Sequence, residues 1–561
     1  MSAQPFHVRW LGRVAYDEAW DLQQALFTGS HDHLLLLEHP PTYTLGRRTR
    51  EENVLVDPAS VGAELRRVNR GGDVTFHGPG QLVGYPILSV PGRRGGGMAD
   101  TRAYVHSVEQ VLIDSLADLG LDAERLPGEP GVWLDVDGLR PRKIAAIGVR
   151  LGRGRSMHGF ALNVDVDLDW FSNIVPCGLA DKGVTSLAAE GIDASMEEVA
   201  SVVANHAARH FAPSRPVDRS DVVWKKSETD LSAFSLGAGP GERIKPQRDV
   251  EPERVGVAVQ LGRRLDQAGV TEGLDVSTRK PDWMRVKLQT GPELHKLKSV
   301  SRDLGLVTVC EEAGCPNLFE CWNEGTATFM LLGERCTRKC GFCLVDTSKP
   351  EPPDPTEPDR VAEAIDGLAL EFAVLTMVAR DDLDDGGAGV VAETVAAIQH
   401  RTPNTGVEVL ISDLRGSESS LNTIIAAGPN VLNHNIETVA RLQRAVRPSA
   451  SYARSLTVLA RAKQAGMTTK SGLIVGMGET FDEVVSTMTD LAAVGVDIIT
   501  IGQYLRPTTN HLPIHRWWTP DEFAALKRIG EDGLGIPHVE SSPLTRSSHH
   551  AGSAASAAAG N

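Results

Sequence analysis

The chain has 561 residues, more than the roughly 150 of one typical domain, which predicts at least two hydrophobic cores. With 41% hydrophobic and 23% charged residues, the composition is globular and excludes a wholly disordered or collagen-like chain. The net charge of −16 argues against binding to nucleic acid or to an anionic membrane. No apolar run reaches the ~18 residues of a membrane span, and no basic-then-apolar signal opens the chain. We therefore expect a soluble, cytoplasmic protein.

The first region, residues 1–216, mixes strand-like and helix-like segments. Apolar runs predict strands at residues 34–37, 83–90 and 144–149, and amphipathic periodicity predicts helices at 104–119 and 196–210. This mixture predicts an α+β or α/β domain. Residues 217–280 are rich in Ser, Gly, Pro and charge, which predicts a linker with one short helix at 254–268. Such a linker is expected to tether the two halves without holding them rigidly, so that the fusion acts by raising local concentration.

The third region, residues 281–550, alternates strands and helices regularly. The predicted strands are 327–332, 372–378, 407–411, 431–435, 471–475 and 497–502, and the predicted helices are 360–368, 390–400, 454–465 and 483–494. Six alternating strands imply a parallel sheet but are too few for an eight-stranded barrel, so a partial (βα)6 barrel is expected. The Ala/Ser/Gly-rich residues 551–561 are expected to form a disordered tail.

The seven cysteines are unevenly distributed, and their odd number argues against a disulfide framework. Cys177 is alone, and the other six form two trios: Cys310, Cys315 and Cys321, then Cys336, Cys340 and Cys343. Neither trio has the paired hooks of a structural zinc site, whereas three thiolates can bind three irons of a [4Fe–4S] cluster. Two irregular zinc sites or scattered buried thiols are the alternative. The second trio follows the first predicted barrel strand, at the edge where such folds carry their active sites.

The spacing Cys-x3-Cys-x2-Cys after a first barrel strand resembles radical S-adenosylmethionine (SAM) enzymes. Together with residues 309–322, 379–387 and 503–507, it resembles the lipoyl synthase family from about residue 280 to 550. The resemblance implies two [4Fe–4S] clusters and SAM, which binds the open iron at the second trio and yields a deoxyadenosyl radical. It also implies an electron donor such as ferredoxin or flavodoxin.

In that family the other cluster, here on the first trio, is the sulfur source, and a serine near the C-terminus is its fourth ligand. The resemblance places this role on Ser548, with Ser547 as the second choice. His549 stands where the family has a tyrosine, and an imidazole there could compete for the iron.

A lone cytosolic cysteine such as Cys177 is more often a small buried apolar residue than a nucleophile. The same region, however, contains the glycine-rich stretch 70–81, an alternating strand that ends in a tight Gly-Pro-Gly turn. That stretch lacks the Gly-Lys-Ser/Thr ending of a P-loop. Lys143 begins an apolar strand, where a charged group is usually solvated, but beside a thiol its ammonium group would lower the thiol pKa.

With residues 158–163, these segments resemble the lipoyl(octanoyl) transferase family over residues 1–216, whose α/β catalytic fold is shared with biotin and lipoate ligases. The resemblance implies that Cys177 is the nucleophile and Lys143 its activating residue. The implied acyl-site residues are Arg70, Gly71, Gly72, Asp73, Val74, Thr75, Phe76, His77, Ala146, Ile147, Gly148, His158, Gly159 and Phe160.

The two resemblances together imply a bifunctional enzyme of lipoate biosynthesis. Its first half would move octanoyl from acyl carrier protein to a lysine of a lipoyl domain or glycine-cleavage H protein, and its second half would insert sulfurs at C6 and C8. One alternative is an acyltransferase joined to a radical SAM sulfur-inserting enzyme for another substrate, as in biotin formation. A non-enzymatic alternative is an iron–sulfur scaffold, which would not need Lys143 or Cys177.

Overall fold

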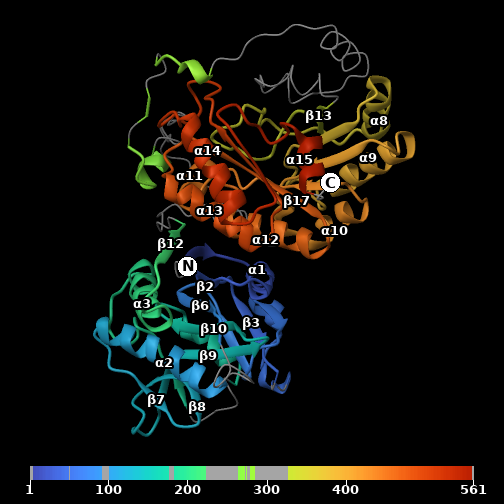
Figure 1. Cartoon of the computed structure of the whole chain (residues 1–561). Coiled ribbons are helices and arrows are strands. Elements are labelled where there is room, and N and C mark those ends of the chain that lie inside the picture. The colour runs from blue at the N-terminus through green and yellow to red at the C-terminus, as the bar shows by residue number, and fades with distance from the viewer. Residues whose placement is uncertain are drawn as a thin grey trace, which may run out of the picture.

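The computed structural model describes residues 4–47, 49, 51–90, 100–175, 182–222, 263–271, 273–274, 278–284 and 326–558. Cys177 and the first trio, Cys310, Cys315 and Cys321, lie outside these residues. Two α/β domains, one from each half of the chain, lie against one another (Figure 1). Among the described helices, none combines the length and apolar character that crossing a membrane requires.

The N-terminal domain is built on a nine-stranded mixed sheet with the order β12-β1-β2-β6-β10-β9-β8-β7, and β11 pairs with β9. A small second sheet has the order β4-β3-β5. The elements are β1 (Phe6–Arg13), α1 (Tyr16–Thr28), β2 (Asp32–Glu38), β3 (Thr42–Leu45), β4 (Glu64–Arg67), β5 (Val74–His77), β6 (Gln81–Ile87), α2 (Thr101–Asp118), β7 (Glu124–Leu126), β8 (Glu129–Leu134), β9 (Arg142–Gly152), β10 (Arg155–Asn163), β11 (Gly183–Val184), α3 (Met196–Phe211) and β12 (Val217–Asp221).

The two faces of the large sheet are covered by different layers. Leu34 and Leu36 of β2 point toward α2 and α3, whereas Leu35 and Leu37 point toward α1 and the C-terminal domain. Side chains alternate along a strand, so four consecutive leucines are all buried only because both faces are covered. The predicted α/β domain is confirmed, but its boundary at residue 216 is too early, because β12 pairs in parallel with β1.

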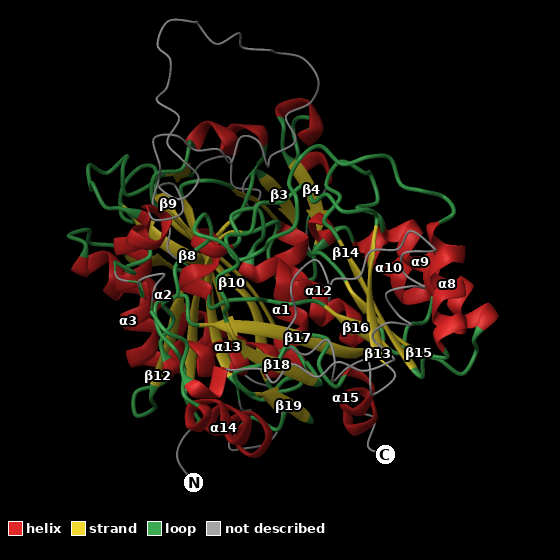
Figure 2. Ribbon diagram, turned by 90° about the horizontal axis from the view of Figure 1, so that it is seen from above, coloured by secondary structure: helices red, strands yellow, loops and turns green. Residues whose placement is uncertain are grey.

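The C-terminal domain is built on a seven-stranded, all-parallel sheet in the simple order β13 to β19, which curves into an open barrel (Figure 2). All six predicted strands are present. The elements are β13 (Thr326–Leu331), α8 (Glu357–Leu368), β14 (Phe372–Met377), α9 (Ala388–Arg401), β15 (Gly406–Leu410), α10 (Glu418–Ala426), β16 (Val431–Asn433), α11 (Gln443–Val446), α12 (Tyr452–Gln464), β17 (Thr468–Val475), α13 (Phe481–Ala493), β18 (Ile498–Gln503), α14 (Pro520–Arg528), β19 (His538–Ser541) and α15 (Ala551–Ala558). Helices α10, α12, α13 and α14 start at a capping serine or threonine; α13, for example, begins with a capping box formed by Thr480 and Glu483.

The C-terminal end of the chain differs from the expectation. Residues 551–558 form helix α15 instead of a disordered tail, and α15 contacts β14, β18 and β19. Ala551 and Ala554 are buried. Small side chains let this helix approach the sheet closely. The Ala-, Ser- and Gly-rich composition, which predicts disorder from the sequence, is therefore compatible with a packed helix. The seventh strand, β19, extends the predicted partial (βα)6 barrel by one parallel strand.

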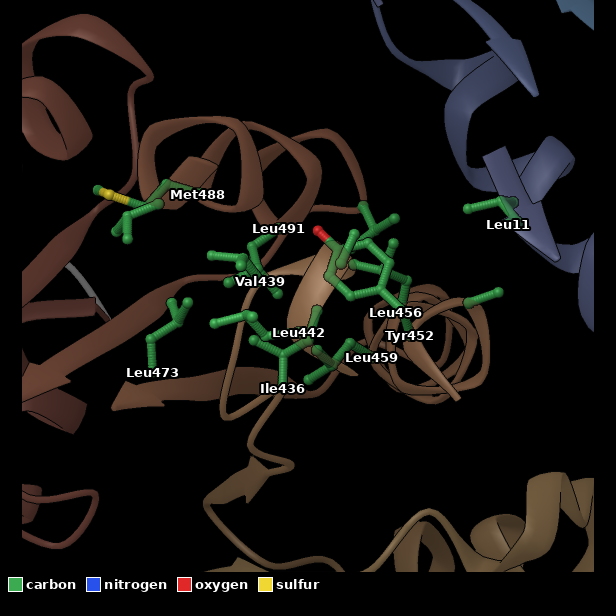
Figure 3. Close-up of a cluster of buried hydrophobic side chains, with 14 of the residues drawn as sticks. Leu11, Ile436, Val439, Leu442, Tyr452, Leu456, Leu459, Leu473, Met488 and Leu491 are labelled. Carbon is green, nitrogen blue, oxygen red and sulfur yellow. The ribbon is translucent and has the colours of Figure 1, made fainter. Parts of the chain in front are cut away.

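The two domains share a continuous apolar core, an interface that the expectation of a loose tether did not include. Helix α1 of the N-terminal domain packs on α12 of the C-terminal domain. Their apolar faces belong to one buried cluster. Figure 3 shows Leu11 on the N-terminal domain, on the side of this cluster that faces Tyr452 and Leu456 of the C-terminal domain. The described part of the predicted linker helix, residues 263–267, joins the same cluster through Leu265. The interface, and not the linker, sets the relative position of the domains.

A buried ion pair crosses this interface. The Arg9 guanidinium donates from Nε to both carboxylate oxygens of Asp490, at 2.7 and 3.0 Å. The Tyr452 hydroxyl donates to the same carboxylate at 2.9 Å. Arg9 also pairs with Asp218 of its own domain at 2.8 Å, whereas the buried Asp490 carboxylate receives its cationic partner from the other domain. Because an unpaired buried charge is strongly unfavourable, this pair favours the docked arrangement.

Candidate active sites

A pocket opens in the N-terminal domain between β8, β9, β10 and β11. Its walls are formed by Thr75, Gln81, Trp133, Lys143, Ala146, Ala161, Asn163, Phe171, Lys182, Gly183 and Val184. Lys143, Thr75 and Ala146 are thus the sequence-predicted residues that line it. Thr75 reaches the pocket because side chains alternate along β5, whose Val74 and Phe76 are buried in a separate apolar cluster.

Two lysines flank one aromatic ring in this pocket. The Lys143 Nζ atom lies 4.5 Å from the centre of the buried Trp133 ring, and the Lys182 Nζ atom lies 5.8 Å from it. Lys182 Nζ is also 3.3 Å from a carboxylate oxygen of Glu129. The described chain resumes at Lys182 after the segment that contains Cys177. Sequence reasoning missed both Trp133 and Lys182, although Lys182 closely follows the Cys177 motif.

The other predicted acyl-site segments converge beside the pocket. Gly71 donates its backbone N–H to Val149 O at 3.0 Å, which joins the glycine-rich stretch to β9. The Arg70 guanidinium donates to the carbonyl and hydroxyl of Thr44 at 2.7 and 2.8 Å. A Cβ at Gly148 would lie 2.9 Å from Arg70 Cδ, so only glycine leaves room for that side chain. Arg70, Gly71 and Gly148 therefore form one packed unit.

The remaining predicted residues of this group take buried or supporting positions. The His158 Nε2 atom lies 2.7 Å from Asn69 Oδ1, and Asp73 accepts a hydrogen bond from Asn53 at 2.6 Å. Phe160 is buried in the core of the large sheet. The other predicted residues do not line the described pocket; they are Gly72, Val74, Phe76, His77, Ile147 and Gly159.

Because this domain contains buried imidazoles, we expect its free energy of unfolding to decrease in mild acid. Burial lowers the pKa of His158 to about 3 and that of His39 to about 4, and it holds the pKa of His77 well below its usual value. The unfolded chain binds these protons near the ordinary value of 6.5, so stability falls as pH falls from there toward 4. The expected loss is up to ~1.4 kcal/mol per pH unit for each imidazole.

Urea unfolding of the full chain at several pH values checks this expectation. The urea concentration at the unfolding midpoint should decrease as the pH is lowered below about 6.5. His158→Gln keeps a donor toward Asn69 but does not titrate, so it should make this decrease shallower. A midpoint that stays constant or rises on acidification would contradict it.

The second candidate site lies at the carboxyl-terminal edge of the C-terminal sheet. There the loop of residues 332–347, called the cluster loop below, follows β13 and carries Cys336, Cys340 and Cys343, all half-buried. Backbone hydrogen bonds fix this loop, among them Cys336 N to Asp346 O at 2.8 Å, Thr337 N to Ala379 O at 3.0 Å and Gly341 N to Val446 O at 2.8 Å. The loop is therefore tied to the ends of β14 and α11.

The donor set of the cluster loop fits an iron–sulfur cluster. Burial raises the pKa of the Cys343 thiol to about 12 and also raises that of Cys340, so a bound cation is needed to hold them as thiolates. Within the described residues no three His, Cys, Asp or Glu side chains converge on a point that would hold one metal ion. A [4Fe–4S] cluster does not require such convergence, because each thiolate binds a different iron.

Ser547 and Ser548 lie half-buried in a turn after β19. The chain leading to them is fixed at the carboxyl end of β18, where Gln503 N donates to Pro543 O at 3.2 Å. A Cβ at Gly502 would lie 1.9 Å from Thr545 O, so this glycine permits the close approach. The chain therefore passes the same sheet edge as the cluster loop at Thr545, three residues before Ser548. The ring of His549 is buried against that of His550, with centroids 3.8 Å apart.

Comparisons with known proteins match each half separately. Residues 15–208 match the lipoyl protein ligase A/B catalytic domain, residues 266–315 the N-terminal domain of lipoyl synthase, and residues 330–491 the radical SAM superfamily. The lipoyl synthase of Mycobacterium ulcerans is 50% identical over 302 residues, which are 54% of this chain and 93% of that protein. The lipoyl synthase of Rubrobacter xylanophilus is 54% identical over 274 residues, 48% of this chain and 85% of that protein.

Solved structures resemble each half more distantly. A bipartite lipoate protein ligase from Thermoplasma acidophilum has a TM-score of 0.33 at 20% identity, over 42% of this chain and 91% of that chain. Methylornithine synthase has a TM-score of 0.32 at 15% identity, over 45% of this chain and 79% of that chain.

Proposed function

The chain belongs to the lipoyl synthase family through its C-terminal half and carries a lipoyl protein ligase A/B catalytic domain in its N-terminal half; from this premise we propose that it catalyses two consecutive steps of lipoate biosynthesis. The N-terminal domain transfers octanoyl to a lysine of a carrier domain. The C-terminal domain then inserts sulfur at C6 and C8 of the bound octanoyl group. The observation that carries this proposal is the presence of both matched domains in one chain, each with a site of suitable chemistry.

In the transfer step, the Cys177 thiolate attacks the thioester carbonyl of octanoyl-acyl carrier protein. The bond to the phosphopantetheine sulfur breaks, and that thiol leaves with a proton. The ε-amine of the carrier lysine then attacks the new thioester and releases Cys177. Lys143 and Lys182 supply positive charge at the pocket wall, which stabilises a nearby thiolate. Conversion of a thioester to an amide is downhill, so the step needs no ATP.

For the second step, Cys336, Cys340 and Cys343 would hold the [4Fe–4S] cluster that binds SAM; such a cluster would supply the electron for cleavage of SAM. Cys310, Cys315 and Cys321 hold a second cluster, the sulfur-donating substrate, with Ser548 as the fourth ligand and Ser547 as the alternative. The approach of Thr545, three residues before Ser548, to the sheet edge that carries the cluster loop supports this assignment.

The partners that this scheme requires are octanoyl-acyl carrier protein, a lipoyl domain or H protein, and a low-potential electron donor such as ferredoxin or flavodoxin. A direct test is anaerobic incubation of the full chain with dithionite, SAM and an octanoylated lipoyl domain. The scheme predicts deoxyadenosine and methionine, with two SAM consumed per lipoyl group formed. An iron–sulfur scaffold would release no deoxyadenosine, and an enzyme for a different substrate would release it without modifying the carrier.

A further inference from the structure

A line of alternating charges runs from the N-terminal domain into the cluster loop. On α1, Glu18 Oε1 lies 2.7 Å from Nε of Arg454 on α12. Arg454 Nη1 lies 3.7 Å from Asp413 Oδ2, and Asp413 Oδ1 lies 2.6 Å from Arg338 Nη2. Arg338 stands between Cys336 and Cys340 in the cluster loop. A carboxylate of one domain is thus linked, through three further side chains, to the proposed cluster ligands of the other.

These charges are largely removed from water. The Asp413 side chain is 0% exposed, that of Arg338 6% and that of Glu18 8%. Buried charges interact more strongly than surface charges and are poorly tolerated without partners. Arg338 also forms a bidentate pair with Asp381, with both N–O distances at 2.7 Å. The position of the Arg338 guanidinium is therefore determined by Asp381 and Asp413 together.

The segment that carries Asp413 is strained and lies against the N-terminal domain. Leu414 and Arg415 have φ values of +47° and +53°, a left-handed conformation that side chains with a Cβ rarely adopt. A Cβ at the next residue, Gly416, would lie 2.5 Å from Glu18 Oε1, so Glu18 of α1 packs directly against this turn. Arg461 on α12 donates to Gly416 O at 2.8 Å. Strained turns persist when their surroundings hold them, and here the domain interface supplies part of that support.

We propose that Glu18 is a positioning residue for the cluster loop, so that docking of the N-terminal domain helps to hold the second cysteine trio in its binding conformation. The transferase domain thereby supports the radical SAM site structurally, in addition to supplying its octanoylated substrate. This inference rests on the proposed function only for the identity of the group that the trio binds.

The chain contains a matched control for this role. Asp21 lies three positions after Glu18 on α1, and its Oδ2 lies 2.7 Å from Arg461 Nε across the same interface. Arg461 contacts the strained turn at the backbone carbonyl of Gly416, and the ion pair that it forms with Asp21 does not involve Asp413. Glu18→Gln and Asp21→Asn each remove one interdomain charge without changing side-chain size, but only Glu18→Gln interrupts the line toward Arg338.

Hydrogen exchange of the iron-free full chain tests the proposal without any cofactor. The peptide containing residues 336–345 reports the amides of Cys336, Thr337 and Gly341, which are hydrogen-bonded in the structure. Glu18→Gln should accelerate its exchange on the order of fivefold, whereas Asp21→Asn should stay near the wild-type rate. Wild-type exchange in Glu18→Gln would overturn the proposal. Equal acceleration in both variants would also overturn it, because that result would indicate general undocking.

A spectroscopic readout adds a second, independent test. In a full chain whose first trio is replaced by alanine, the remaining cluster signal belongs to the second trio. Adding Glu18→Gln should change the line shape of its electron paramagnetic resonance spectrum with SAM, and adding Asp21→Asn should not. An unchanged spectrum in Glu18→Gln would contradict the positioning role. If the parent chain showed no cluster signal, the proposed function would fail instead, and the exchange experiment would still decide the role of Glu18.

Discussion

Replacing Cys336, Cys340 and Cys343 together by alanine should reduce deoxyadenosine formation by at least about 10³-fold, to background. Among the described residues these three are the only cysteines, and the variant would lack the cluster that is proposed to supply the electron to SAM. Anaerobic reconstitution followed by quantification of deoxyadenosine and iron measures the effect. The iron content should fall from about eight to about four per chain, as expected for loss of one of two [4Fe–4S] clusters.

The matched variant replaces Cys310, Cys315 and Cys321 instead. It should lose a similar amount of iron but continue to cleave SAM, while sulfur insertion stops. Ser548→Ala should resemble this second variant. Normal SAM cleavage in both triple variants would contradict the assignment of the two trios to different roles, and normal sulfur insertion in Ser548→Ala would shift the ligand role to Ser547 or a neighbouring histidine.

Replacing Cys177 by serine should lower octanoyl transfer on the order of 10⁴-fold, because a serine hydroxyl remains protonated where a thiolate is required. Lipoyl formation from a carrier that is already octanoylated should continue at the wild-type rate. Mass spectrometry of a lipoyl domain incubated with octanoyl-acyl carrier protein measures the first activity. Since Cys177 is the sole cysteine of the N-terminal half, full transfer in the variant would disprove covalent catalysis by a thiol there.

The two pocket lysines allow the activation of Cys177 to be examined separately. If Lys143 acts by lowering the thiol pKa, the defect of Lys143→Ala should shrink as pH rises and the thiol ionises without help. Lys182→Ala is the natural comparison, because Lys182 Nζ faces the same Trp133 ring but also lies 3.3 Å from Glu129. A defect of Lys143→Ala that does not depend on pH would assign Lys143 another task.

The sequence was most informative where its periodicity was strong. Six of the seven barrel strands were predicted because apolar runs and amphipathic helices alternate there at regular intervals. The seventh, β19, was missed because His538 and Glu540 interrupt a strand of four residues. Helix α15 was missed because its sequence consists mainly of alanine and serine. Without larger apolar side chains such a segment indicates disorder unless a partner surface is known.

The domain interface could not be predicted from the sequence. Its ion pairs join residues that are far apart along the chain; Glu18 and Arg454, for example, are 436 positions apart. The continuous apolar run of β2 indicates a strand covered on both faces, but it does not identify the second covering layer. In the N-terminal site, the resemblance identified Lys143 from its motif, whereas Trp133 and Lys182 became visible only when the fold brought β8 and β11 beside β9.

Catalysis of two consecutive steps by one chain can be measured by following a single carrier through both. An unmodified lipoyl domain is incubated anaerobically with the full reconstituted chain, octanoyl-acyl carrier protein, SAM and dithionite, and its mass is recorded over time. We expect the octanoylated carrier to appear first and then to convert to the lipoylated carrier. A carrier that stays unmodified, or that accumulates octanoyl without ever gaining sulfur while the clusters remain intact, would contradict it.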